Sequence, residues 1–128
     1  MTLRERIEQA VREEAAPLPY AVVVAQREFE AWLIAALDSL RGCRGIRTDA
    51  TAYHAPEAVR DAKGQIERFM EGSASYSETR DQTALTATFD MKAAYERCRS
   101  FRRLVCAFGA LVAGMGGDLP QWPPPSWD

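Results

Sequence analysis

The sequence predicts an α+β fold that is mainly helical and contains one or few strands. The apolar run at residues 20–25 (YAVVVA), which follows Pro19 and precedes polar residues, is typical of a buried strand. Apolar residues then recur at helical spacing, first from Phe29 and Trp32 and again in later segments. A lone strand leaves backbone groups unpaired on both edges. We therefore expect the sheet to be completed by a partner chain or by a weak strand elsewhere.

In the first half of the chain, three elements and a loop are expected. Thr2 and Glu5 form a capping-box pattern for a helix that ends before Pro17. After the strand at residues 20–25, a helix is predicted over residues 28–41. The glycines and polar residues of residues 42–55, which include His54, indicate a long loop.

In the second half, local patterns predict four more helices. Pro56 stands at a favoured first position of a helix that ends before Gly72. After a polar connector at residues 73–80, Asp81 is expected to cap a short helix and Asp90 to cap another. Ser100 begins the last helix, whose inward face is predicted to comprise Phe101, Leu104, Val105, Phe108, Leu111 and Val112. Residues 1–118 are thus expected to form a single incomplete domain, followed by a Pro/Trp-rich tail at residues 119–128.

Composition bounds the class of protein. The chain has 128 residues, a formal net charge of −2, 47% hydrophobic and 27% charged residues, as an ordinary globular protein does. This charge does not support nucleic-acid binding, and the longest apolar stretch, residues 104–115, is too short to span a membrane. No signal-peptide pattern opens the chain. Cys43, Cys98 and Cys106 lack metal-ligand spacing, so we expect reduced thiols in a cytoplasmic protein, with Cys106 in the core.

Two carboxylates, Glu28 and Glu30, stand where the predicted strand passes into the helix. Open α/β sheets place ligands just beyond the carboxyl ends of their strands, and carboxylates there can hold a magnesium ion. The pair can converge on one ion only if the strand continues to about residue 30, because alternate residues share a face on a strand but not on a helix. The alternative is that both favour the helix macrodipole.

Other candidates each allow two interpretations. Lys63 could meet a carboxylate or a phosphate, or extend its charge to solvent along an apolar face. Tyr76 and Thr79 could donate to a ligand or fix a loop. Arg97, Arg99, Arg102 and Arg103 could position a phosphate backbone or form a solvated face. Trp32 is expected in the core, whereas Trp122 and Trp127 suggest that the tail docks onto another surface.

The order VVVAQREFEAWLIAALDSL, PEAVRDAKGQIERFM and YSETRDQTALTATFDMKAAYERCRSFRRL resembles the C-terminal half of a bacterial domain-of-unknown-function family, number 4276. The strongest correspondences are Glu30 and Trp32 (an E-x-W element), Lys63, Tyr76 and Thr79, and the pair Ser100 and Phe101. The resemblance implies a TOPRIM-like fold, metal-dependent phosphoryl transfer on nucleic acid, and an ATPase of the ATP-binding-cassette type as a partner in defence-like loci.

Two differences between this chain and the family pattern decide which function we expect. In full-length relatives the remaining acidic metal ligands lie upstream of the matched region, and Glu78 stands here where relatives carry lysine. We therefore expect a non-catalytic assembly or regulatory subunit that forms homo-oligomers. The alternative is a nuclease-like module completed by another polypeptide, with catalytic candidates Glu28, Glu30 and Lys63. In either case Glu30 is expected to be a buried hub that meets Lys63, Tyr76 or the arginines near Ser100.

Overall fold

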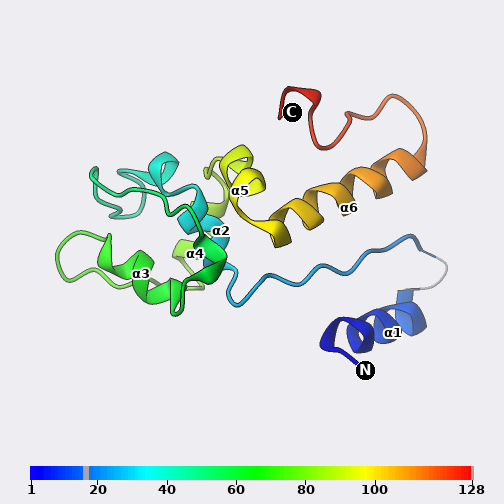
Figure 1. Cartoon of the computed structure of the whole chain (residues 1–128), viewed down its shortest axis with the longest axis horizontal. Coiled ribbons are helices and arrows are strands. Elements are labelled where there is room, and N and C mark those ends of the chain that lie inside the picture. Colours follow the sequence, from blue (N-terminus) through cyan, green and yellow to red (C-terminus); the bar gives the residue numbers. More distant parts are fainter. Residues whose placement is uncertain (16–17, 128) are drawn as a thin grey trace. The chain divides into compact units, whose positions relative to one another are not determined.

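A computed structural model describes residues 1–15 and 18–127 and is mainly helical (Figure 1). The chain divides into two compact units. We call residues Ala25–Phe101 the central unit, and residues Met1–Val24 with Arg102–Asp128 the terminal unit. The tail therefore groups with the N-terminal segment, and the domain boundary expected after residue 118 stays a prediction.

The central unit is built around α2 (Glu30–Ala35), all six residues of which are buried. The helices α3 (Ala62–Arg68), α4 (Asp81–Thr86) and α5 (Met91–Arg97) and the 3-10 turn η2 (Pro56–Ala58) pack against it (Figure 1). A helix that is apolar on nearly all sides requires such enclosure. The fully buried members of this core include Leu33, Ile34, Leu37, Leu40, Ile46, Ile66 and Leu85.

The helix predicted over residues 28–41 is shorter and divided. It begins at Glu30 as α2 and, after a non-helical residue at Ala36, continues as the 3-10 turn η1 (Leu37–Leu40). Pro56 likewise opens only one 3-10 turn, and α3 begins separately behind Asp61, which accepts a hydrogen bond from the Gly64 N–H at 3.2 Å. The hydrophobic spacing predicted the buried faces but not these interruptions, because 3-10 and α turns place similar faces inward over one turn.

Two predicted caps differ in outcome. Asp90 caps α5 as expected, accepting from the backbone N–H groups of Lys92 and Ala93. Asp81 does not cap α4 but is its first residue, behind Arg80. The Asp81 carboxylate instead accepts from the backbone N–H of Ser77 at 2.8 Å, within the preceding connector.

In the terminal unit, α1 (Leu3–Ala15) confirms the predicted capping box. The Thr2 N–H donates to Glu5 at 2.7 Å and the Glu5 N–H donates to the Thr2 hydroxyl at 3.1 Å. The last helix, α6 (Arg99–Met115), starts in the central unit and supplies most of its length to the terminal unit.

The tail of the terminal unit is folded rather than simply extended. It ends in a 3-10 turn, η3 (Pro125–Trp127). The Trp122 ring lies 6.0 Å from the ring of Phe108 on α6 and 5.7 Å from that of Trp127, both edge to face. The two tail tryptophans are therefore half-buried against α6 and each other instead of fully exposed.

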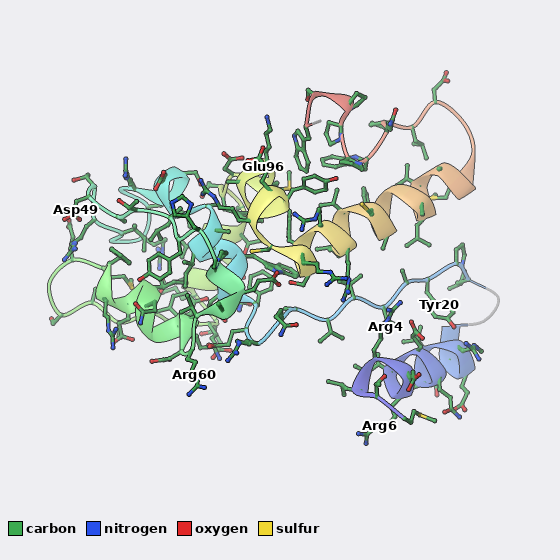
Figure 2. The ribbon with its side chains drawn as sticks, in the orientation of Figure 1. Arg4, Arg6, Tyr20, Asp49, Arg60 and Glu96 are labelled. Carbon is green, nitrogen blue, oxygen red and sulfur yellow. The ribbon has the colours of Figure 1, made fainter. Side chains whose placement is uncertain are left out.

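The strand predicted at residues 20–25 is not formed within this chain. Throughout the described residues, the one β-type pairing is an isolated bridge between Ile46 and Met70. The phenolic oxygen of Tyr20 accepts from Arg12 of α1 at 3.3 Å, which holds the start of the segment near that helix (Figure 2). The β-branched composition favours an extended chain, but a strand also requires an edge to pair with, and the described part of the chain offers none.

Two further predictions are wrong. Leu104 and Phe108, expected to face inward, are among the exposed large apolar residues, although Phe101 and Val105 of the same helix are buried. Cys106, expected in the core, is exposed, and Cys98 is the buried thiol. The error at Leu104 and Phe108 arises because the hydrophobic spacing predicts one continuous inward face along α6, whereas burial among its large apolar residues is limited to Phe101 and Val105. Separately, no helix in the described residues is long and apolar enough to cross a membrane.

Candidate functional site

Glu30, the first residue of α2, is a buried carboxylate with two neutral donors. The Tyr76 hydroxyl and the Gln82 side-chain amide each donate to its Oε1 atom, both at 2.9 Å. An unpaired buried carboxylate would be costly, so these donors are what allow Glu30 to lie in the core. The expected contact of Glu30 with Tyr76 is therefore present.

The surroundings of Tyr76 keep its hydroxyl protonated, so that it acts as a hydrogen-bond donor. Its burial, followed by the hydrogen bond to Glu30 and the charge of that carboxylate, raises the pKa of Tyr76 above its ordinary value. A phenol in this state keeps its proton at neutral pH and has little capacity to act as a base. Thr79 lies beyond it in the connector, where its hydroxyl hydrogen-bonds that of Ser77 at 3.1 Å.

Lys63 completes this cluster through a different carboxylate. Its Nζ atom lies 2.6 Å from Glu78, and this contact is the main reason that the pKa of Lys63 is raised. The charges of Glu30 and Glu28 add to the same effect. Both side chains of the ion pair are about half exposed, at 42% and 56%, so the pair is accessible to solvent.

An open pocket of about 640 Å³ joins three of the predicted residues. Its lining comprises Asp61, Lys63, Gly64, Glu67, Tyr76, Ser77, Glu78 and Thr79. Three carboxylates and one ion-paired lysine make the pocket net acidic, and its tyrosine is committed to Glu30. The arrangement can bind or position a group.

Glu28 has a separate structural task. Its carboxylate accepts from the backbone N–H of Ala62 at 2.8 Å and of Lys63 at 3.4 Å, at the start of α3. Helix termini leave such N–H groups without partners, and a carboxylate there is also favoured by the macrodipole. Glu28 therefore fastens the segment before α2 to α3.

The donor set does not fit the magnesium site expected from Glu28 and Glu30. Glu28 is directed to the α3 backbone, whereas Glu30 is directed to Tyr76 and Gln82. In residues 1–15 and 18–127, no three His, Cys, Asp or Glu side chains are grouped closely enough to hold a metal ion. A shared ion at this pair would require both carboxylates to leave these hydrogen-bond partners.

The tryptophan of the E-x-W element carries a second buried connection. The Trp32 indole N–H donates to the Ser100 hydroxyl at 2.8 Å, and that hydroxyl donates to Glu57. The Glu57 carboxylate also accepts from the backbone N–H groups at the start of α6, including that of Arg99 at 2.5 Å. The Trp32 ring packs against Phe29 and Phe101, at centroid distances of 4.9 and 5.2 Å. Trp32 is thus a core residue, as predicted, and ties α2 to α6.

The predicted arginine group does not form one site. Arg97 donates to the backbone carbonyl of Ala35 at 2.6 Å, which closes the end of α2. Arg99 is exposed in the central unit and does not line the pocket beside Lys63. Arg102 and Arg103 belong to the terminal unit.

Sequence reasoning missed three residues on which the central unit depends: Glu57, Gln82 and Asp81 as a buried acceptor. Glu57 and Gln82 reach partners 43 and 52 positions away in the chain. No local motif marks such long-range acceptors and donors. The turn signals around Asp81 were visible, but they suggested a helix cap rather than an ion-pair partner.

The chain belongs to the family described as "Domain of unknown function (DUF4276)", whose model matches residues 1–108. The family expected from the sequence is therefore confirmed. Comparison with curated proteins found no match, and comparison with solved structures found none either.

Proposed function

We propose that this member of the family is a non-catalytic assembly subunit that forms a homodimer through its terminal unit. One observation carries the proposal: the terminal unit exposes large apolar side chains along both of its long helices. Exposed apolar stripes of this kind usually mark interaction surfaces. The roles of Glu28 and Glu30 as internal acceptors add support, because these two carboxylates are directed to different partners rather than to one shared ligand.

The two apolar stripes follow helical spacing. On α1, Leu3 and Ile7 are one turn apart and are 58% and 36% exposed. On α6, Leu104 and Phe108 are one turn apart, Met115 follows two turns later, and Phe108 is 49% exposed. Residues four or seven apart lie on one helix face, so each helix presents these exposed apolar side chains on one face.

A second copy of the same chain fits these surfaces. Within α1 the charged residues are mixed and net acidic, with four glutamates and three arginines, whereas every charged residue of α6 is an arginine. An α1 helix on the α6 helix of another copy would therefore pair opposite charges around apolar contacts. Because each copy carries both helices, the same contact occurs twice in a two-fold dimer, which closes the assembly.

The backbone of residues 20–25 provides a second contact for the proposed dimer. Their valine-rich, extended segment makes no ladder in the described chain. In a dimer the same segments of two copies could pair, and this would complete a small sheet as the TOPRIM-like interpretation requires. An ATPase of the ATP-binding-cassette type, implied by the resemblance, would then bind the assembled dimer.

The oligomeric state tests the proposal directly. By light scattering after size-exclusion chromatography at micromolar concentration, we expect a dimer. Ile7→Asp and Phe108→Asp should each give a folded monomer, because a charge would be buried in the interface. Met91→Asp is the matched control: Met91 is also exposed, at 41%, but lies in the central unit. A monomeric wild type, or a dimer disrupted by Met91→Asp alone, would overturn the proposal.

Catalysis by the chain alone is tested separately. Two-metal phosphoryl transfer requires several carboxylates that converge on adjacent ions, and Glu28 and Glu30 are directed to different partners. We expect no cleavage of plasmid or single-stranded DNA with magnesium or manganese. Cleavage that Glu30→Gln abolishes would favour the nuclease-like alternative instead.

A further inference from the structure

Two arginines of the central unit converge on one buried carboxylate. Arg44 donates to Asp81 Oδ1 through Nε and Nη2, both at 3.1 Å, and Arg80 donates to the same atom through Nε at 3.3 Å. The Asp81 side chain is only 2% exposed, whereas those of Arg44 and Arg80 are 42% and 62% exposed. The carboxylate therefore lies beneath two guanidinium groups that reach solvent.

These groups line a pocket of about 310 Å³, which we call the arginine pocket. Its remaining lining is Met70, Ala74 and Ser75. The two arginines and Asp81 give the lining a net positive charge. This contrasts with the acidic pocket beside Lys63, so these two pockets suit different ligands.

The guanidinium groups retain donors for a ligand. Each guanidinium has five N–H donors, and Asp81 receives bonds from two nitrogens of Arg44 and one of Arg80. Within the described part of the chain, these bonds leave Nη1 of Arg44 and both Nη atoms of Arg80 for an incoming oxyanion. Planar arginine forks match the geometry of phosphate oxygens, and the Ser75 hydroxyl in the same lining can add a hydrogen bond.

The backbone holds Arg44 in place before any ligand arrives. Arg44 has φ 49°, in the left-handed region that non-glycine residues rarely adopt. The loop is fastened on both sides: the Gly42 N–H donates to the Ile46 carbonyl at 2.8 Å, and the Glu71 N–H donates to the Gly45 carbonyl at 2.7 Å. A donor that is already positioned loses less entropy when it binds.

We propose that the arginine pocket binds the phosphate group of a small molecule, as a phosphate monoester or as inorganic phosphate. The pocket has room for one such group, and the net charge of −2 on the whole chain disfavours a long polyanion. The site recognises its ligand rather than transforming it, because Asp81, the carboxylate in its lining, is hydrogen-bonded to both arginines.

Calorimetric titration of the full chain at constant ionic strength tests this proposal, with inorganic phosphate, AMP and a dinucleotide phosphodiester as three separate ligands. We expect saturable binding of phosphate or AMP with Kd of about 1 mM or below. Tighter binding of AMP would identify a monoester as the ligand, and equal binding would identify the free anion. A dinucleotide that binds best would overturn the small-molecule assignment.

Matched arginine variants locate the binding. Arg80→Gln and Arg44→Gln should each weaken binding by about tenfold or more, since each removes a charged fork. Arg47→Gln is the control, because Arg47 lies in the same loop, is 44% exposed and pairs with Asp49 at 2.9 Å outside the pocket; Asp49 is labelled in Figure 2. Arg80 is exposed and makes one bond to Asp81, so Arg80→Gln keeps the test valid even if Arg44→Gln unfolds the loop.

Two results would overturn the proposal: no saturable binding of phosphate or AMP by the wild type, or an equal loss of affinity in Arg47→Gln and Arg80→Gln. The second result would mean that the positive charges of the loop attract anions without a specific binding site. The arginine pocket lies in the central unit, whereas the proposed dimer contact lies in the terminal unit. If the phosphate-binding proposal fails, the dimer proposal therefore still stands.

Discussion

The central and terminal units place their large apolar side chains in opposite ways. Among the described residues, seventeen of the eighteen buried apolar side chains belong to the central unit, and Val105 is the exception. Nine of the ten exposed large apolar side chains belong to the terminal unit, and Met91 is the exception. The terminal unit has the longer helices, α1 and α6. Helix length and capping therefore do not by themselves create a core, because a helix is stabilised mainly by what covers its apolar face.

The largest expected loss of stability comes from a substitution in the core of the central unit. Leu33 is completely buried in α2, so Leu33→Ala should lower the free energy of unfolding by about 3 kcal/mol, through lost burial and a residual cavity. Leu104→Ala on α6 should cost less than about 1 kcal/mol, because Leu104 is already exposed. Urea unfolding followed by circular dichroism, at low concentration to limit association, measures both. Equal costs would contradict the contrast between the units.

A second prediction concerns the polar centre of the same core. Glu30→Ala leaves the Tyr76 hydroxyl and the Gln82 amide without their shared acceptor, so it should cost about 3 kcal/mol. Lys63→Met is the control, since Lys63 pairs with the exposed Glu78 rather than with Glu30. We expect its denaturation midpoint to match that of the wild type. If Glu30→Ala also left the midpoint unchanged, Glu30 would act as a surface charge rather than a hub.

The third prediction follows from the acid sensitivity of the central unit. Burial disfavours the charged form of Asp81, but hydrogen bonds from the Ser77 N–H, Arg80 and Arg44 outweigh it and lower the pKa of Asp81 below its ordinary value of 3.8. In the window between these two pKa values the unfolded chain binds more protons than the folded chain. Asp81 therefore stabilises the fold fully above about pH 5, and this contribution is lost as the pH falls through the lowered pKa.

The variant Asp81→Asn tests the direction of this pH dependence. At pH 7 it should cost about 2 kcal/mol, because the charge-assisted bonds to both arginines are lost. The cost should shrink as the pH falls from 3.8 towards the lowered pKa of Asp81, because protonation of the unfolded wild-type chain then reduces the advantage of the charged carboxylate. The free energy of unfolding, measured from pH 7 to pH 2.5, reports both. A cost that stayed constant down to pH 2.5 would show that Asp81 acts through its shape and not its charge.

The sequence predicted those features that depend on neighbouring residues. The capping box of Thr2 and Glu5 and the Asp90 cap use partners within three positions, and both are present. The contact between Glu30 and Tyr76 was expected from the order of the family elements. The strand at residues 20–25 failed because hydrophobic pattern reports which residues favour a strand, whereas pairing requires a second edge. The ion pair between Arg44 and Asp81 was missed because it joins residues 37 positions apart.

The remaining prediction concerns the contact between the tail and α6 at Gly109. At Gly109 of α6, an added Cβ atom would lie 1.9 Å from the backbone carbonyl oxygen of Trp122, so the tail must move away to accommodate it. Gly109→Ala should therefore separate Trp122 from Phe108 and expose the tail tryptophans. Acrylamide quenching of tryptophan fluorescence should increase, because the quencher gains access to the indole rings. The core of the central unit should unfold at the same urea concentration as in the wild type.

Gly114→Ala on the same helix supplies the control for Gly109→Ala. An added Cβ atom at Gly114 meets nothing within 4 Å, so this substitution carries the gain of about 1 kcal/mol in helix propensity without the clash. Gly114→Ala should leave the quenching unchanged, whereas Gly109→Ala should raise it. If the tail also shields the apolar stripe of α6 from the second copy, releasing it would strengthen the dimer; if the tail forms part of the interface, the dimer would weaken. Light scattering of the two variants decides between these roles, and equal quenching in both would show that the tail does not rest on α6 at Gly109.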